Sequence, residues 1–175
     1  MLHWACDTWG KFTTPIVGPT LIRNFRMHHV DPQDITKHGF IETNASSCFP
    51  MPIFISVGLL ITPNSFFIQT YEWTIIFGVV LGILTNEIHK WAHMVHSKPH
   101  PVVRFLQKSR LILSHEEHHR HHQGEFDRSY CIINGWMNPF LENIDYWRRM
   151  EKLITRVTGA EPRCDDAFWR QVKSA

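Results

Sequence analysis

Cysteines are few in this 175-residue chain, and no two of them lie close together. Cys6, Cys48, Cys131 and Cys164 form neither a CxxC pair nor the dense pattern of a secreted disulfide scaffold. We therefore expect free thiols in a reducing compartment.

Long runs of Lys and Arg are also missing, and the net charge is only +2. The sequence thus lacks the basic patch with which proteins usually bind nucleic acid, which argues against DNA or RNA partners. The length allows one domain with a core and is short for two, so we expect a single domain over residues 1–175.

Charged side chains are absent from two stretches in the first half of the chain. No Asp, Glu, Lys or Arg lies between Glu42 and Glu72, nor between Glu72 and Glu87. Apolar residues dominate both gaps, and each apolar stretch is about long enough to cross a bilayer as a helix. We predict transmembrane helices at 49–67 and 73–91.

The distribution of basic residues supports a membrane hairpin. Four of the eighteen Lys and Arg residues precede the first stretch and fourteen follow Ile88, as expected for two spans with both chain ends on the cytoplasmic side. Histidines before and after the hairpin can then meet on one face of the membrane. The alternative is a buried helical pair of a soluble protein, which Pro50, Pro52 and Pro63 in the first stretch would favour.

Residues 140–158 carry apolar side chains at spacings of three or four and predict one amphipathic helix, ended by Gly159 and then Pro162. Its basic face includes Arg148 and Lys152. This face is expected either to lie against anionic headgroups or to flank a helix packed on the same domain.

Histidine is unusually frequent, at thirteen of 175 residues, and most of the histidines fall into four groups. Histidine is the commonest metal-ligating side chain, so their spacing bears on metal binding. In the first and third groups, residues four apart share one face of a helix. The groups are His3 with Asp7, His28 and His29 with His38 nine residues later, His89 with His93, and the histidines within 115–122.

Each group alone is a weak indication, because a lone HxxxH is often structural and a His-rich loop can bind metals nonspecifically. Together the groups offer more imidazoles than one zinc site or one facial-triad iron site uses. Two metal ions that share about nine histidines fit the count, and imidazole ligands with open positions suit iron and dioxygen. Other residues are expected to orient the ligands by hydrogen bonds without binding the metal themselves. They are Asp7, Asp31, Asp34 and Asn86.

Ordered motifs extend from the first histidine almost to the C terminus. They are His3-Trp4-x-x-Asp7-Thr8-Trp9-Gly10, Pro15-Ile16-Val17-Gly18, Arg26-x-His28-His29-x-Asp31-Pro32, Ile35-Thr36-x-His38-x-Phe40-Ile41-Glu42-Thr43-Asn44, Thr85-Asn86-x-Ile88-His89-Lys90-Trp91-x-His93, His118-x-x-His121-His122, Tyr130-Cys131-Ile132 and Gly135-Trp136-x-Asn138. In this order they resemble the Kua-type lipid desaturase family, and most closely its plasmalogen-forming members. The family has transmembrane helices upstream of the first motif, so we expect this single lipid desaturase domain to be shortened at its N terminus.

The resemblance implies an all-α fold, a membrane-embedded helical hairpin with a cytosolic His-rich helical cap that holds a di-iron centre. It implies an oxidoreductase of the endoplasmic reticulum membrane, with its site facing the cytosol. The enzyme would use O2 and electrons from cytochrome b5 and its reductase to introduce the vinyl ether double bond into 1-O-alkyl ethanolamine phospholipids. No catalytic side chain is expected beyond the metal ligands. The implied ligands are His3, His28, His29, His38, His89, His93, His118, His121 and His122.

Two overlapping triplets fit the family's HxxHH motif: His118, His121 and His122, and His115, His118 and His119. When the sequence is aligned with the family at Tyr130-Cys131-Ile132, the motif falls on His118, His121 and His122. Four histidines match no family position and are expected to be solvated: His96, His100, His115 and His119. Three alternatives remain open. They are an acyl-lipid desaturase that forms a trans double bond in phosphatidylglycerol, a His-rich metal-binding or transport protein, and an inactive short isoform.

Overall fold

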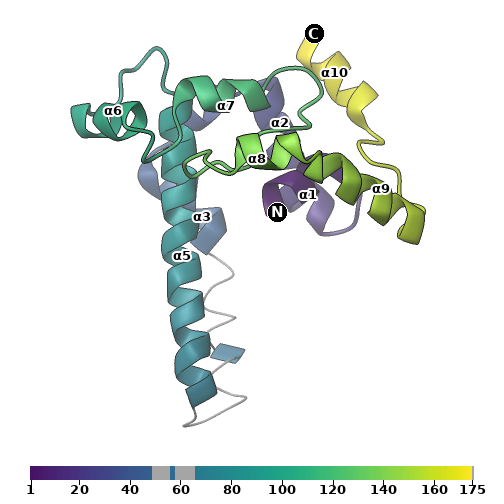
Figure 1. Cartoon of the computed structure of the whole chain (residues 1–175), viewed down its shortest axis with the longest axis horizontal. Coiled ribbons are helices and arrows are strands. Elements are labelled where there is room, and N and C mark those ends of the chain that lie inside the picture. Colours follow the sequence, from purple (N-terminus) through teal and green to yellow (C-terminus); the bar gives the residue numbers. More distant parts are fainter. Residues whose placement is uncertain (49–55, 58–65, 175) are drawn as a thin grey trace.

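The computed structural model describes residues 1–48, 56–57 and 66–174, and all regular structure within these ranges is helical. The expectation of an all-α fold is thus confirmed for this part of the chain. The molecule has two parts, the long helix α5 (Phe66–His93) and a cap of shorter helices gathered around its C-terminal end (Figure 1).

Helix α5 contains the second predicted span, 73–91, and extends beyond it at both ends. Its segment Gln69–His93 is long and apolar enough to cross a membrane, and it is the one helix of the described ranges of which this holds. Only 28% of its apolar window is buried inside the protein. The other predicted span, 49–67, lies almost wholly outside the described residues.

The exposed surface of α5 is apolar along the part that projects from the cap. Such exposure suits a helix surrounded by lipid, because exposed large side chains of this kind are costly in water. The large apolar side chains involved are Trp73, Ile76, Phe77, Val80, Leu81 and Leu84.

The cap wraps the C-terminal end of α5 with elements from both sides of it in the sequence. Helix α3 (Phe40–Cys48) packs against α5, and Asn44 donates a hydrogen bond of 2.9 Å to the Glu87 carboxylate. The remaining elements are α1 (Leu2–Thr8), η1 (Gly18–Ile22), α2 (Arg23–Val30), η2 (Asp34–Lys37), α6 (Pro101–Lys108), α7 (His115–His121), α8 (Asn138–Asn143), α9 (Tyr146–Thr158) and α10 (Asp166–Ser174).

Two small apolar cores hold the cap together. One joins α1 to α9 through Trp4, Tyr130 and Trp147, and the other surrounds the end of α5 at Ala92 and Leu113. Trp4 of the first core follows His3 and Ala92 of the second precedes His93, so the apolar packing fixes the backbone beside these histidines.

The predicted single helix at 140–158 is wrong in one respect, because the structure divides it into α8 and α9. Asp145 takes a left-handed conformation (φ 52°), which an α-helix of L-residues does not continue through. Asp adopts this conformation more readily than most residues, so the apolar spacing continues across the break and hides it. Gly159 (φ 71°) ends α9, as predicted.

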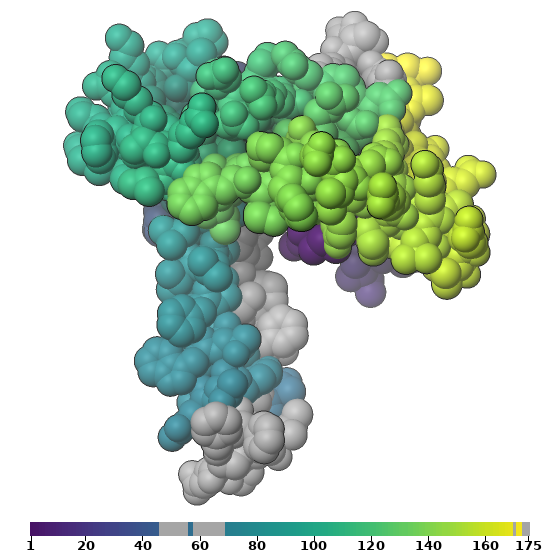
Figure 2. Space-filling model, viewed as in Figure 1, coloured from purple at the N-terminus to yellow at the C-terminus, as the bar shows by residue number. Residues whose placement is uncertain are grey.

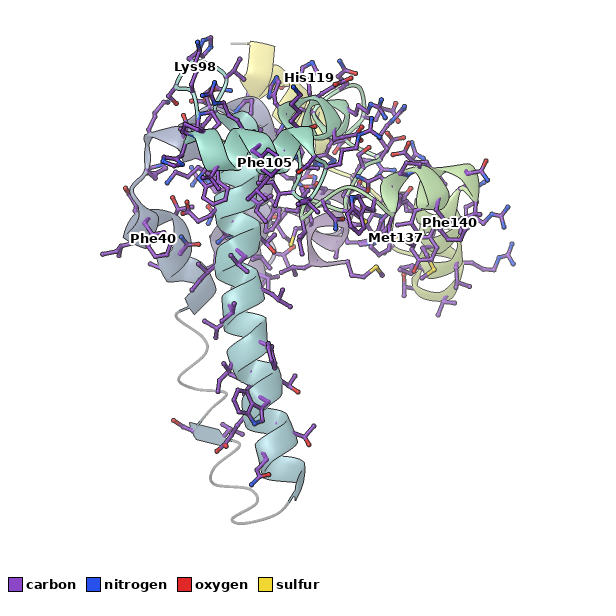
Figure 3. The ribbon with its side chains drawn as sticks, turned by 60° about the vertical axis from the view of Figure 1, so that its left-hand side comes forward. Phe40, Lys98, Phe105, His119, Met137 and Phe140 are labelled. Carbon is purple, nitrogen blue, oxygen red and sulfur yellow. The ribbon has the colours of Figure 1, made fainter. Side chains whose placement is uncertain are left out.

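Labelled side chains mark the two ends of the cap along the axis of α5. Met137 and Phe140, both more than half exposed, lie on the side of the cap from which α5 projects, whereas Lys98 and His119 lie at its far end (Figure 3). The space-filling view shows α8 and α9 along the lower part of the cap, beside the projecting helix (Figure 2).

Candidate metal centre

Four helices aim their histidines at one region inside the cap. His89 and His93 share a face of α5, and His3 and Asp7 share a face of α1, while His118 lies one turn before His122, the C-cap residue of α7. His28 and His29 are neighbours on α2, where successive side chains point about 100° apart, so that they enter two different groups. The resulting clusters are His28, His89, His93, His118 and His122, and His3, Asp7, His29 and His121.

In the five-histidine cluster, the ring nitrogens face one another at close range. The Nε2 atom of His93 lies 3.2 Å from that of His89 and 2.8 Å from that of His118, and His122 Nε2 lies 3.0 Å from His118 Nε2. Two imidazole nitrogens that bind one metal ion at about 2.1 Å lie roughly 3.0–3.4 Å apart. The nitrogens of this cluster are therefore spaced much as in a shared coordination sphere.

Hydrogen bonds alone account for only part of this close packing. A neutral imidazole nitrogen carries either one proton or one lone pair, so it takes part in one strong in-plane hydrogen bond. His93 Nε2 and His118 Nε2 each face two partners, and at most two of the three contacts can be hydrogen bonds. Three other buried nitrogens of this cluster have no hydrogen-bond partner: Nε2 of His28 and Nδ1 of His118 and His122.

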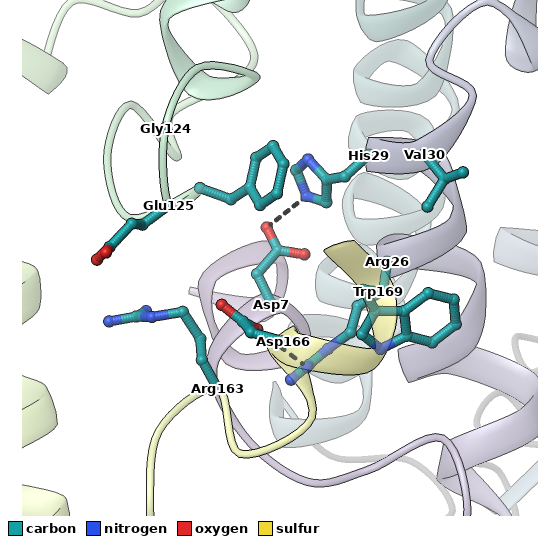
Figure 4. A pocket seen from close by; sticks show the side chains of 10 residues that line it. Asp7, Arg26, His29, Val30, Gly124, Glu125, Arg163, Asp166 and Trp169 are labelled. Atoms are coloured by element: carbon teal, nitrogen blue, oxygen red, sulfur yellow. Dashed lines mark ion pairs between the residues drawn. The ribbon is translucent and has the colours of Figure 1, made fainter. Parts of the chain in front are cut away.

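The second cluster is centred on one carboxylate oxygen. Oδ2 of Asp7 lies 3.1 Å from His3 Nε2, 3.1 Å from His29 Nε2 and 3.4 Å from His121 Nε2. All four side chains are buried, and Figure 4 shows the contact between Asp7 and His29. None of these four atoms has an aligned hydrogen-bond partner. Buried polar atoms left in this way cost about 1–3 kcal/mol each, so the cluster calls for a cation.

A hydrogen bond at Nδ1 of His121 fixes the tautomer of its neutral ring. Its Nδ1 donates to the backbone carbonyl of Arg128 at 2.7 Å. In the neutral ring Nε2 then carries the lone pair, and it faces the Asp7 carboxylate. A lone pair and a carboxylate oxygen repel each other at this distance unless a cation lies between them.

Burial keeps the imidazoles in the form that binds metal. It lowers the pKa of His28 and of His118 well below the usual value, and neighbouring imidazoles lower it further. Burial also lowers the pKa of His29 to about 4, although Asp7 opposes the change. Burial alone would raise the pKa of Asp7, but His29 and His3 hold it well below its ordinary range. Neutral imidazoles around an ionised carboxylate are a metal-ligand set.

The two clusters adjoin each other. The rings of His29 and His122, one from each cluster, have centroids 4.9 Å apart, and those of His121 and His122 are 5.4 Å apart. The donor set of nitrogens with one carboxylate suits two neighbouring transition-metal ions of the iron or zinc type. The residues present therefore fit a pair of transition-metal ions.

Eight of the nine histidines predicted as ligands belong to these clusters, and His38 does not. The His38 side chain is 36% exposed, and its ring nitrogens lie 3.2 Å from Asp34 Oδ2 and 3.0 Å from Glu42 Oε1. These carboxylates, Glu42 first, raise the pKa of His38, which favours the protonated form that does not bind metal.

The four residues predicted to support the ligands have different surroundings. Asp7 lies among the ligand atoms themselves. Asp31 and Asp34 are exposed and pair with Lys37 Nζ at 3.1 and 3.3 Å. Asn86 donates a hydrogen bond of 3.3 Å to the Thr43 carbonyl and thereby joins α5 to α3.

Sequence reasoning gave no site role to Tyr130, whose ring centroid lies 5.1 Å from that of His121 and 5.7 Å from that of His3. Its hydroxyl donates to the Phe126 carbonyl at 2.6 Å, and burial raises its pKa. Tyr130 belongs to the motif Tyr130-Cys131-Ile132, and this membership was the one sequence feature that could have pointed to a role near the site. The four histidines expected to be solvated, His96, His100, His115 and His119, are exposed.

A cavity of about 120 Å³ opens beside Asp7 and His29 (Figure 4). Phe126, Val30 and Trp169 give it a largely apolar lining. Arg26 also borders it but pairs with Asp165 and Asp166, so its charge is already compensated. The cavity offers a small apolar space directly against the second cluster.

Comparisons with known proteins agree with this site. The family model described as "Lipid desaturase domain" matches residues 1–165. Plasmanylethanolamine desaturase 1 of Mus musculus is 40% identical over 98% of this chain and 65% of its own length. Plasmanylethanolamine desaturase of Myxococcus xanthus is 40% identical over 94% of this chain and 58% of its own length.

A more distant relative is the chloroplastic fatty acid desaturase 4 of Arabidopsis thaliana, which is 30% identical over 92% of this chain and 48% of its own length. The chain thus spans less than two thirds of these curated relatives. No solved structure matches it.

Proposed function

The chain belongs to the lipid desaturase family, and on that basis we propose that it is a membrane di-iron desaturase that forms the vinyl ether double bond of 1-O-alkyl ethanolamine phospholipids. Bound iron would supply the activation of O2, with electrons from cytochrome b5 and its reductase. We propose eight histidines and Asp7 as the ligands, and the endoplasmic reticulum membrane as the location, with the site facing the cytosol.

The observation that carries this proposal is the pair of adjoining buried clusters. A nonspecific metal-binding tract would leave its histidines in solvent, whereas His118 and His121 are 1% and 0% exposed. Nine ligand residues exceed the needs of one metal ion and suit two. The names of the relatives that are 40% identical supply the substrate class.

The protein's own residues would hold the ions, exclude water and admit the lipid. The cavity against Asp7 and His29 has a mostly apolar exposed lining, although Glu125, Arg163 and Asp166 also border it, and it would admit the reacting end of an alkyl chain to the second cluster. The hydrogen bond of His121 to the Arg128 carbonyl holds that ring in the ligand orientation.

The shape of the molecule supports a position at a membrane surface. Helix α5 projects its apolar side chains away from the cap, and Met137 and Phe140 are exposed on the side of the cap that α5 leaves. With α5 in the bilayer, these side chains lie at the interface, where amphipathic surfaces of peripheral elements are stable. The clusters are then held just outside the membrane, within reach of a lipid headgroup region.

Restoring the gene to cells that lack vinyl ether lipids tests the proposal. We expect vinyl ether phospholipids to return with the wild-type protein and not with His89→Ala or His121→Ala, while His96→Ala, at an exposed position, restores them. Return of these lipids with either ligand variant would refute the ligand assignment.

The same lipid profile separates a second candidate. The 30% identity to a protein named fatty acid desaturase 4 favours a double bond placed in an acyl chain. Acyl chains with a new double bond and unchanged alkyl ethers would select that alternative.

A further inference from the structure

We propose that His115 and His119 form an exposed, weak metal site that passes metal ions inward to the five-histidine cluster. The inference rests on the proposed function, because it takes the buried clusters to be metal sites. Neither histidine belongs to those clusters, and neither matches a motif of the family resemblance.

The first observation is the spacing on α7. His115 and His119 are four residues apart, and their rings stack with centroids 5.7 Å apart at an angle of 26°. Within this turn, residues 115–119 read His-Glu-Glu-His-His, which contains the HExxH spacing. Two histidines at this spacing on a helix can bind one zinc ion, so the pair has metal-binding geometry without any help from the buried residues.

The second observation is the protonation of His115. Its Nδ1 lies 2.8 Å from the Ala92 carbonyl oxygen, which only accepts hydrogen bonds. Nδ1 is therefore the protonated nitrogen, and in the neutral ring Nε2 carries the free lone pair. A backbone carbonyl behind an imidazole is the usual way in which a metal-binding histidine is oriented.

The third observation is the cavity that joins the two sites. A cavity of about 220 Å³ is lined both by His115 and His119 and by His93, His118 and His122 of the five-histidine cluster. It is large enough for an ion with part of its hydration shell. The outer pair and three histidines of the inner cluster therefore border the same cavity.

The arrangement sets the direction of transfer. The outer pair offers two protein ligands and water, whereas the inner cluster offers five imidazoles. His119 also lies at the end of the cap away from the projecting α5, which is the aqueous side (Figure 3). Ions arriving from water would thus bind loosely first and exchange their waters for imidazoles step by step.

The test follows metal uptake by the purified full chain in detergent after removal of its metal. Co²⁺ is added at a limiting concentration, its ligand-field absorption gives the uptake rate, and elemental analysis gives the final content. We expect His119→Gln to slow uptake by about tenfold, comparable with the loss when a coordination partner is removed, and to reach the wild-type content. His96→Gln, at another exposed histidine outside both clusters, should load at the wild-type rate.

A titration of the metal-loaded protein with Zn²⁺ provides a second measurement. We expect one extra, weakly bound ion in the wild type and in His96→Gln, and none in His119→Gln. Equal uptake rates for His119→Gln and the wild type, or an extra ion that persists in His119→Gln, would overturn the proposal. Failure of the proposed function would give a different result, because the wild type itself would then retain no tightly bound metal. The proposed delivery role would then be refuted as well.

Discussion

The indole Nε1 of Trp4 donates a hydrogen bond of 3.4 Å to the Glu151 carboxylate, although the two residues are 147 positions apart. Trp4 adjoins His3 on α1, and Glu151 lies on α9, so this bond ties the helix that carries His3 and Asp7 to the C-terminal part of the cap. Arg163 pairs with the same carboxylate at 2.7 and 3.0 Å, and Arg148 at 3.0 Å.

Replacement of Glu151 by Gln should destabilise the cap. The Arg163 side chain is 8% exposed and would lose its counter-charge, and removal of one partner of a buried ion pair costs about 3–5 kcal/mol. We expect the melting temperature of the detergent-solubilised chain to fall by roughly 10 °C. Glu161→Gln, at an exposed position, should leave it unchanged. A melting temperature that also stays unchanged in Glu151→Gln would contradict this role.

Asp7 is predicted to bind metal directly. Asp7→Asn keeps the size of the side chain and removes the charge on which three imidazoles converge. We expect the metal content to fall by about one ion per chain, whereas loss of a residue that only supports a ligand weakens metal affinity about 10–100-fold. Metal content and metal affinity together therefore distinguish the two roles.

Asp31→Asn is the matched control for this experiment, because Asp31 is exposed and pairs with Lys37. It should retain the wild-type metal content. If Asp7→Asn also retained both ions with unchanged affinity, the second cluster would not be a metal site.

His38→Ala tests the one predicted ligand that lies outside the clusters. Since Asp34 and Glu42 contact both ring nitrogens and raise the pKa of His38, we expect the variant to keep its metal. His93→Ala, at a buried position of the five-histidine cluster, should lose metal under the same conditions. Equal losses in the two variants would restore His38 to the ligand set.

The histidine pattern could be predicted because the ligands are local in sequence. Two histidines four residues apart on a helix share one face, and the adjacent His28 and His29 point to two different faces. These directions do not depend on the rest of the fold. The all-α class and the family follow from the same motifs; the family is confirmed, and the all-α class is confirmed for the described part of the chain.

The remainder depends on distances that the sequence does not display. The spacing of four residues places Asp7 on the helical face of His3, but it does not show that Asp7 lies at the centre of a cluster while Asp31 lies at the surface. The Trp4–Glu151 bond joins opposite ends of the chain. The break at Asp145 needed only one left-handed residue, which leaves the apolar spacing of the flanking turns intact.

The side of the cap that faces the membrane can be measured with spin labels. After Cys48, Cys131 and Cys164 are replaced by Ser, with Cys6 buried, Phe140→Cys and Lys98→Cys provide one labelling site at each end of the cap (Figure 3). In bilayers we expect the label at 140 to be accessible to lipid-soluble O2 and the label at 98 to a water-soluble nickel reagent. Equal accessibility at the two sites would refute the proposed orientation of the cap on the membrane.

Removal of metal should destabilise the wild-type protein. Without ions, the Nε2 atoms of His3, His29 and His121 and the Asp7 carboxylate would remain buried and without hydrogen-bond partners in the second cluster alone. An ion present at about a thousand times its dissociation constant contributes roughly 4 kcal/mol to folding stability. For a chain of this length we therefore expect a chelator to lower the melting temperature by about 10 °C, and added Fe²⁺ to restore it.

The chelator already saturated with metal is the control, since it separates metal removal from any direct effect on the detergent micelle. A melting temperature that the free chelator leaves unchanged would mean that the clusters are stable without metal, and that the unpaired atoms find their partners in protons.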